Sequence, residues 1–361
     1  MKNKEIHIVS FDVPFPADYG GVIDVFNRSK ALKEAGFKVI LHVFEYGRGR
    51  NHVFQEIADA IFYYKRSSFL KSFLQGKAYI TSSRISTELI QRLNESSSDL
   101  IILEGQHCSG ILPFLKRKAV VRIHNCEWEY YAALAEKETS FLKKIYFKRE
   151  AKFLKKEEQV LKNSSLLCIT KKEQEYYTNK GFEAILVPTV FFTEVQNTSY
   201  PIENYLLFHG NLSVSENVSA VQQLISENKK EKFNFKVCIA GKNPSKELKE
   251  QVESAQFELI DSPDETKMKK LIFGAKAHVL LTNQATGIKL KIIHALSSKR
   301  PVIVNEKMIQ GTGLEDSCFV WDEKSPLSSF VNEVLQMPTK AVDLSDFRPE
   351  IYSSQIDLIS K

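Results

Sequence analysis

Short β-branched runs alternate with segments of helical periodicity along the chain, and this alternation constrains the fold more than any other feature. It is typical of parallel sheets flanked by helices. The run Glu5–Phe11 is followed by Val22–Ala35, whose apolar residues recur at helical spacing, and then by the run Phe37–Phe44. Gly36 lies where a helix C-cap is expected. These residues predict a βαβ unit at the start of the chain.

The strand-like runs form two series, separated by the polar stretch Thr193–Pro201. The first series is Glu5–Phe11, Phe37–Phe44, Asp99–Glu104, Val120–Asn125, Ser165–Thr170 and Glu183–Pro188. The second is Tyr205–Gly210, Phe235–Gly241, Phe257–Asp261, Ala277–Asn283, Pro301–Asn305 and Cys318–Trp321. Helices are expected near 216–228, 245–254, 264–275, 288–298 and 325–337.

The length of 361 residues exceeds what a single core usually supports, so two domains are expected. We predict an α/β protein with two Rossmann-like, doubly wound parallel-sheet domains facing a cleft, residues 1–195 and 196–345. Residues 346–361 are expected to pack back on the first domain as a helix. A ligand is expected at the carboxyl ends of the strands, where strand order reverses.

The net charge of +6 is a mild basic excess. No zinc-finger spacing or RNP-like strand accompanies it, so a nucleic-acid partner is not indicated. An anionic small ligand, a membrane surface or a solvated basic face explains it instead. The five cysteines are scattered without a C-x-x-C pair, which argues against a disulfide framework and a structural zinc site. The chain has no signal-like start and no membrane-spanning apolar run, so we expect a cytoplasmic protein.

Gly20 and Gly21 follow the first strand, where the first helix begins. Paired glycines there expose backbone N–H groups and let a diphosphate or a sugar approach closely. A tight loop without a ligand explains them equally well. The G-x-G-x-x-G fingerprint is missing at this strand end, which disfavours an oxidoreductase.

His124 ends a predicted buried strand within the segment VVRIHNCEWEYY. A histidine in that position can bond sugar hydroxyls or exchange a proton near neutral pH. The alternative is a histidine that bonds local backbone and caps the strand, with Glu127 and Trp128 starting the next helix.

The segment Thr286–Val304, TGIKLKIIHALSSKRPVIV, carries the strongest signal for a ligand. A helix is expected after Gly287, with Lys289 and Lys291 at its amino end. Aligned N–H groups, the helix dipole and an ammonium group together suit a diphosphate. Stabilising a departing diphosphate also promotes sugar transfer without a metal. Two solvated lysines on an amphipathic helix are the alternative.

Five motifs in order give the chain a resemblance to the GT-B glycosyltransferases of the large retaining group called family 4, over roughly residues 5 to 340. They are the glycine pair of Asp18–Gly21, R-x-H-N-x-E with paired tyrosines at Arg122–Tyr131, LLFHGNLSVSENVSAV at Leu206–Val221, IAGKNPS at Ile239–Ser245, and Gly287–Val304. The resemblance implies transfer of a sugar from a nucleotide-diphosphate donor to a sugar or lipid-linked acceptor in polysaccharide or glycoconjugate biosynthesis. It also implies retention at the anomeric carbon, no cofactor and no required metal.

The resemblance further implies where the substrates bind. The donor is expected to contact Gly210, Asn211, Gly287, Lys289 and His294 of the second domain. The acceptor is expected near Gly20 and Gly21, and His124, the expected catalytic residue, would contact the transferred sugar without acting as the general base.

The sequence departs from the family pattern at four positions. Thr286 and His294 stand where the group commonly carries two glutamates, and Asn211 and Glu216 stand where it carries a diphosphate-binding Arg and Lys. Lys289 would then supply most of the positive charge. These departures motivate an alternative function, a catalytically degenerate GT-B protein that binds nucleotide sugars or serves as a partner subunit. A nucleotide-sugar epimerase would need acid–base carboxylates that the sequence does not place.

The segment Phe141–Lys162 interleaves lysines with Phe and Leu. A basic amphipathic helix of this kind can lie on the inner face of an anionic membrane, which suits a lipid-linked acceptor. A solvated helix with Glu150, Glu157 and Glu158 as charge partners is the alternative.

Overall fold

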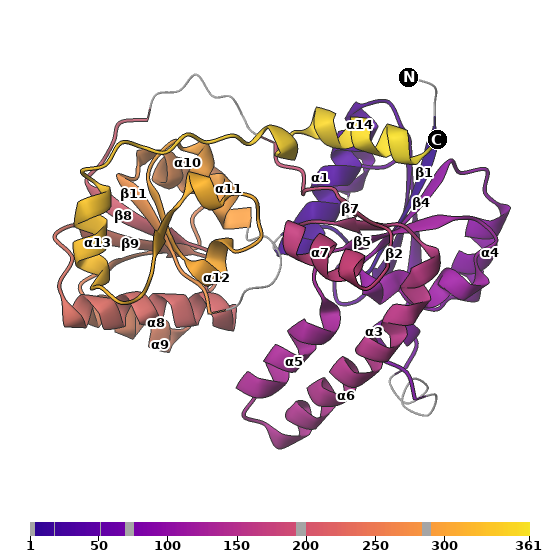
Figure 1. Ribbon diagram of the computed structural model, residues 1–361, viewed down its shortest axis with the longest axis horizontal. Coiled ribbons are helices and arrows are strands. Elements are labelled where there is room, and N and C mark those ends of the chain that lie inside the picture. Colours follow the sequence, from indigo (N-terminus) through magenta and orange to yellow (C-terminus); the bar gives the residue numbers. More distant parts are fainter. Residues whose placement is uncertain (1–3, 18, 51, 69–75, 193–199, 284–289) are drawn as a thin grey trace. The chain divides into compact units, whose positions relative to one another are not determined.

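The computed structural model describes residues 4–17, 19–50, 52–68, 76–192, 200–283 and 290–361 (Figure 1). Contacts divide the chain into an N-terminal unit, Met1–Phe192 with Ser345–Lys361, and a C-terminal unit, Thr193–Leu344. The predicted domain boundary between residues 195 and 196 lies outside the described residues. In the described part of the chain, no helix is long and apolar enough to cross a membrane.

The N-terminal unit contains a seven-stranded parallel sheet in the order β3-β2-β1-β4-β5-β6-β7. Its strands are β1 (Glu5–Ser10), β2 (Lys38–Glu45), β3 (Ala60–Lys65), β4 (Leu100–Glu104), β5 (Ala119–Ile123), β6 (Leu166–Cys168) and β7 (Ala184–Leu186). Strands β4 and β5 are buried throughout, as expected where helices cover both faces. Strand order reverses between β1 and β4, so a crevice is expected at their carboxyl ends.

The helices of this unit follow the strands in βαβ fashion. They are α1 (Gly20–Glu34), α3 (Tyr79–Ser82), α4 (Thr87–Glu95), α5 (Glu127–Lys137), α6 (Phe141–Glu157), α7 (Lys171–Asn179) and α14 (Pro349–Ile359), with 3-10 turns η1 (His52–Glu56), η2 (Gln106–Phe114), η3 (Glu158–Asn163) and η5 (Ser345–Phe347). Gly36 has a φ of +85° and follows the end of α1, where the Phe37 N–H bonds the Leu32 carbonyl. This is the glycine-terminated helix end that the sequence predicts.

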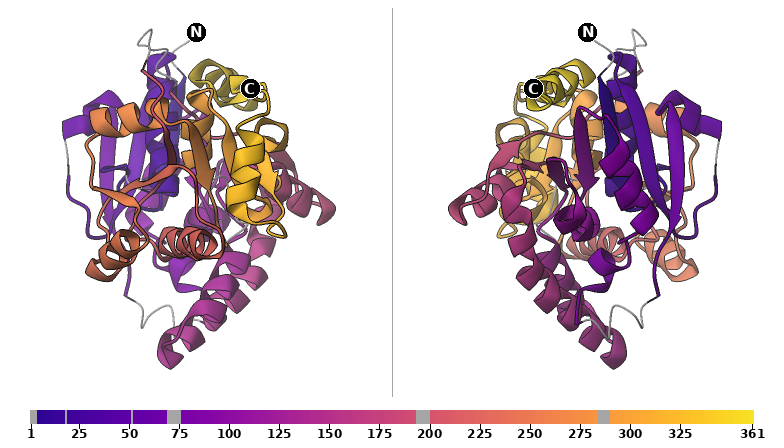
Figure 2. Two further views of the ribbon diagram at one scale, coloured as in Figure 1. Left: turned by 90° about the vertical axis from the view of Figure 1, so that its left-hand side faces the viewer. Right: turned by 90° about the vertical axis from the view of Figure 1, so that its right-hand side faces the viewer.

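Two parts of the N-terminal unit matter for function. Helices α5 and α6 pair along their lengths and project from the sheet as a hairpin, seen in magenta in Figures 1 and 2. The C-terminal helix α14 packs beside α1, and its Tyr352 and Ile356 join the core cluster on that face of the sheet. The end of the chain therefore completes the N-terminal unit.

The C-terminal unit contains a six-stranded parallel sheet in the order β10-β9-β8-β11-β12-β13. Its strands are β8 (Tyr205–His209), β9 (Lys236–Gly241), β10 (Glu258–Asp261), β11 (Ala277–Leu280), β12 (Val302–Asn305) and β13 (Phe319–Trp321). Its helices are α8 (Ser215–Lys230), α9 (Lys246–Ser254), α10 (Glu265–Gly274), α11 (Leu290–Ser297), α12 (Glu306–Ile309) and α13 (Leu327–Val334), with the 3-10 turn η4 (Glu315–Ser317). Here strand order reverses between β8 and β11.

The predicted fold class is confirmed, because both units are doubly wound α/β sheets of parallel strands. The twelve predicted strands all occur, but one further strand, β3, was not predicted. It is an edge strand whose side chains are mostly half-buried. In the sequence its aromatic residues run directly into the basic stretch that begins at Lys65, which obscured its boundary.

Candidate functional site

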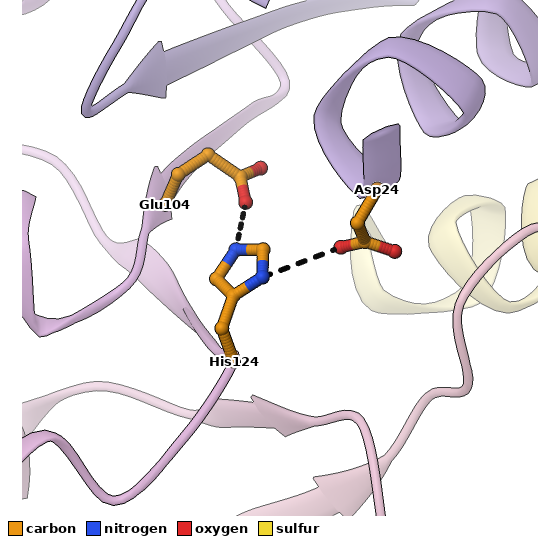
Figure 3. Close-up of side chains that lie close together, drawn as sticks. All are labelled: Asp24, Glu104 and His124. Atoms are coloured by element: carbon orange, nitrogen blue, oxygen red, sulfur yellow. Dashed lines mark hydrogen bonds and ion pairs between the residues drawn. The ribbon is translucent and has the colours of Figure 1, made fainter. Parts of the chain in front are cut away.

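His124 lies directly after β5, near the point where strand order reverses in the N-terminal sheet, and is largely buried. Its Nε2 atom is 2.9 Å from Oε2 of Glu104, the last residue of β4. Its Nδ1 atom is 3.8 Å from Oδ2 of Asp24 on α1. Figure 3 shows the imidazole ring between the two carboxylates. The predicted position at a strand end is correct, and the partners are carboxylates rather than local backbone.

Two fully buried arginines neutralise these carboxylates. Arg28 bonds both Asp24, at 2.8 Å, and Glu104, at 2.5 Å. Arg122 on β5 reaches Asp24 at 3.2 Å, and the Thr189 hydroxyl donates to the same carboxylate. Burial alone would raise the pKa of Asp24, but the charges of Arg122 and Arg28 outweigh it and hold that pKa well below its usual range. Both acids are therefore ionised and fixed in place.

The pKa of Glu104 is likewise set by burial against neighbouring charges, and this bears on whether the site can bind a metal. Burial would raise its pKa, whereas Arg28 and the hydrogen bond from His124 lower it below the usual value. Ligand atoms of Asp24, Glu104 and His124 lie within 4.8 Å of one another, a spacing that a cation can use. However, two guanidinium groups already balance the two carboxylates. This donor set fits a neutral ion-pair network better than a cation cage, and the predicted independence from metal stays a prediction.

Gly20 and Gly21 form the first residues of α1, as predicted. A Cβ atom on Gly21 would lie 2.7 Å from Cζ of Phe11, so a larger residue here would require the Phe11 ring to move. Tyr19, at the N-cap, makes no side-chain cap bond in the described structure. Tyr19 therefore leaves the backbone N–H groups of this helix start to other partners.

In the C-terminal unit, Gly210 and Asn211 follow β8 at the reversal of strand order. The Gly210 N–H bonds the Ala240 carbonyl at 3.1 Å, and the Asn211 side chain accepts from the N–H of Ser213 at 3.0 Å. A Cβ atom on Gly241, which ends β9, would lie 1.8 Å from the Gly210 carbonyl oxygen. Glycine at position 241 is thus required for this loop to close.

Lys291 of α11 supplies a positive charge at the same loop. Its Nζ atom donates to Oδ1 of Asn217 at 2.8 Å and lies 4.9 Å from the ring centroid of Phe208. Asn217 in turn donates to the Asn211 carbonyl at 2.8 Å. The sequence predicts Lys291 near a helix start and predicts that Lys289 supplies most of the positive charge. Gly287 and Lys289 lie outside the described residues, so their predicted roles stay predictions.

His294 lies one turn beyond Lys291 on α11, and its side chain is exposed. Burial, followed by the charges of His278, His294 and Lys291, holds the pKa of His209 well below its usual range. His209 is the last residue of β8. The predicted donor residues Gly210 and Asn211 directly follow this strand, and His294 shares α11 with Lys291.

Glu216 stands where the family pattern has a basic residue, and a hydrogen bond holds its side chain. It accepts a hydrogen bond from the Thr282 hydroxyl at the end of β11. Sequence reasoning did not predict the partners Asp24, Glu104, Arg28, Asn217 and Thr282. One usable signal existed: Asp24 and Arg28 are charged residues four apart on the apolar face of a predicted helix, which suggests a buried ion pair.

Comparison with known proteins identifies the architecture. Residues 203–337 match the family described as Glycosyl transferases group 1. A protein of the Klebsiella pneumoniae cps region, itself uncharacterised, is 26% identical over 334 residues, covering 86% of this chain and 84% of the relative.

Solved structures match over nearly the whole chain. Sucrose-phosphate synthase from Thermosynechococcus elongatus superposes with a TM-score of 0.68 at 13% identity, covering 99% of this chain and 98% of that one. HepE from Anabaena, in complex with UDP and glucose, gives 0.65 at 13% identity, with 99% of each chain covered. The predicted GT-B glycosyltransferase architecture is confirmed, whereas membership of the retaining family 4 group stays a prediction.

Proposed function

We propose that this chain, which has the GT-B glycosyltransferase fold and a C-terminal unit matching the group 1 glycosyl transferases, moves a sugar from a nucleotide-diphosphate donor to a sugar or lipid-linked acceptor. The observation that carries the proposal is the Lys291 ammonium beside the Gly210–Asn211 loop at the switch point of the C-terminal sheet. Ligands of doubly wound folds bind at such points.

The donor site combines two sources of positive potential, a helix start and an ammonium group. Helix α8 begins just after the Gly210–Asn211 loop, and its N-cap residue Val214 offers no capping side chain. Its first N–H groups and the Lys291 ammonium therefore suit the oxygens of a pyrophosphate. When the sugar leaves, the same groups stabilise the charge that develops on the diphosphate. The solved structure of HepE with UDP and glucose supports a donor of this class.

His124 is proposed to contact the transferred sugar from the N-terminal unit. The ionised Glu104 carboxylate accepts a hydrogen bond from Nε2. Nδ1 lies beyond hydrogen-bond distance from Asp24, so it is available for a hydrogen bond with a sugar hydroxyl. Retention of configuration and independence from a metal belong to the same proposal, on the resemblance to the retaining group.

The proposed setting is polysaccharide biosynthesis, supported by the relative from a cps region. A lipid-linked acceptor would bring the enzyme to a membrane surface, and the tip of the α5–α6 hairpin suits that contact. Phe141, Leu142 and Ile145 are 75%, 78% and 49% exposed there. Lys143 and Lys148 are exposed on the same turns. Apolar side chains rimmed by lysines match an anionic lipid surface.

The alternative is a GT-B protein that binds nucleotide sugars without turning them over. It is favoured by Glu216, whose carboxylate lies on the first turn of α8 and adds negative charge to the diphosphate site. A titration with UDP, followed by turnover assays on a panel of nucleotide sugars, separates the possibilities. Transfer or donor hydrolysis supports the enzyme, binding alone supports the alternative, and no binding of any nucleotide contradicts both.

A further inference from the structure

Glu127, the first residue of α5, places a carboxyl group inside the N-terminal unit, close to His124 in sequence. The residue is 3% exposed. Among the described residues its carboxyl makes no hydrogen bond, and its Oε1 atom lies 3.7 Å from Nδ1 of His107, too far for a hydrogen bond. Buried carboxyl groups without partners are rare because their desolvation is costly.

His107 faces this carboxyl with an unsatisfied atom of its own. Its Nδ1 is buried and makes no hydrogen bond. His107 lies two positions after Gly105, which has a φ of +67° directly after β4, and a Cβ atom at Gly105 would lie 2.8 Å from that Nδ1. The chain thus uses a glycine in a left-handed conformation to turn His107 toward Glu127. Neither the Glu127 carboxyl nor Nδ1 of His107 has a hydrogen-bond partner among the described residues. Such a pair suggests that a bound group supplies the hydrogen bonds.

The environment keeps both groups uncharged. Burial raises the pKa of Glu127 to about 8, against the opposing charge of Arg84. Burial, then the charges of Arg84, His124 and Arg66, holds the pKa of His107 well below its usual range. Near neutral pH the pair therefore offers one O–H donor and several acceptors. A hydroxyl group, which both donates and accepts, complements this set better than an ion does.

The location connects the pair to the proposed reaction centre. The ring of Phe11, just after β1, packs against His107 with centroids 4.9 Å apart and meets His124 edge-on at 5.6 Å. The His107 side chain is about one-fifth exposed, so part of its ring reaches the surface while its Nδ1 atom stays buried. Glu127, His107 and His124 therefore occupy one edge of the N-terminal sheet.

We propose that Glu127 and His107 bind a hydroxyl group of the acceptor sugar and orient it beside His124. This inference rests on the proposed glycosyltransferase function and names residues for the acceptor that neither the resemblance nor the comparisons assign. The carboxyl O–H donates to the oxygen of the hydroxyl, and the hydroxyl in turn donates to Nδ1 of His107.

The test uses saturation-transfer NMR on the full chain in the presence of UDP, with methyl glycosides of glucose, galactose and N-acetylglucosamine as probes. Wild-type protein should transfer saturation to at least one glycoside. Glu127→Ala and His107→Phe should weaken that binding about tenfold, which is the loss of one or two buried hydrogen bonds. Glu127→Gln, which keeps a donor and an acceptor, should retain most of it.

Glu129→Gln is the matched control, because Glu129 lies on the same turn of α5 and its carboxylate lies 4.0 Å from the Lys172 ammonium. It should bind like wild type. The proposal is overturned if no glycoside binds wild-type protein, or if Glu127→Ala binds as well as the control. UDP affinity, measured on each variant, should not change. Failure of UDP to bind wild-type protein would instead contradict the proposed donor site. The comparison of glycoside binding between Glu127→Ala and the control would still decide the acceptor proposal.

Discussion

The Nη1 atom of Arg28 lies 3.1 Å from the phenol oxygen of Tyr352, and this bond joins the last helix of the chain to the ion network behind His124. The two residues are 324 positions apart in sequence. Arg28 also holds Asp24 and Glu104, the two carboxylates that face the imidazole. The C-terminal helix therefore helps to fix the candidate site as well as the core.

Tyr352→Phe should lower the free energy of unfolding of the N-terminal unit by about 1–2 kcal/mol, because a buried guanidinium loses a partner. Urea unfolding followed by pulsed hydrogen exchange and mass spectrometry measures each unit separately. Tyr46→Phe, at a side chain that is 65% exposed, is the control and should change nothing. Equal stability of the two variants would mean that the Arg28 contact contributes little.

Glu104→Gln should cost more, about 3 kcal/mol, because it leaves the buried charge of Arg28 partly uncompensated. The amide also offers His124 a weaker acceptor, so the imidazole should lose its fixed orientation. The same exchange experiment gives the stability, and ¹⁵N NMR of the imidazole nitrogens reports the tautomer. Glu95→Gln, at an exposed position on α4, is the control. An unchanged tautomer in Glu104→Gln would contradict the positioning role.

Lys291→Met should weaken UDP binding about tenfold or more, because it removes the ammonium beside the Gly210–Asn211 loop while keeping the apolar stem over Phe208. Isothermal titration calorimetry measures the change. Lys229→Met, at the far end of α8 on an exposed position, is the matched control. If both variants bind UDP like wild type, the assignment of the donor site is wrong.

Acid should destabilise the N-terminal unit through His42. This residue is fully buried between His7 and Tyr64, with hydrogen bonds of 2.9 Å to each. Burial, with the charges of His7 and Arg92, lowers its pKa from 6.5 to about 3. Between these two pKa values His42 takes up a proton in the unfolded chain but not in the folded chain. Stability therefore falls as pH decreases from 6.5, by up to about 1.4 kcal/mol per pH unit for this histidine.

His42→Phe tests this assignment, because the variant lacks the group that titrates. Its free energy of unfolding should depend less steeply on pH than that of wild type between about pH 6.5 and 4.5, where most carboxylates are still ionised. The baseline stability at neutral pH will differ, so only the slope is compared. Parallel slopes for the two proteins would assign the acid sensitivity to other groups.

The sequence predicted the elements of this fold far better than the partners within its sites. His124 was recognisable because a polar residue ends an apolar run. Its partners Glu104 and Asp24 come from other elements, and their approach depends on a strand order that puts β4 between β1 and β5. Periodicity reveals which segments are strands, but it does not reveal which strands are neighbours. Lys291 meets Asn217 for the same reason, since α8 and α11 follow the adjacent strands β8 and β11.

The tip of the α5–α6 hairpin gives the most direct test of membrane contact. Phe141→Ser combined with Leu142→Ser should reduce binding to phosphatidylglycerol vesicles about tenfold or more. Each large apolar side chain contributes roughly 1.5–3 kcal/mol when it leaves water, and Lys143 and Lys148 remain to give a weaker, salt-sensitive attraction. Sedimentation with phosphatidylglycerol and with phosphatidylcholine vesicles measures both effects, and wild type should prefer the anionic lipid. Phe114→Ser, at a phenylalanine of the same unit that is 51% exposed, is the control. Membrane contact by the tip is contradicted if Phe114→Ser binds vesicles no better than the hairpin variant. It is also contradicted if wild type binds phosphatidylglycerol and phosphatidylcholine vesicles equally well.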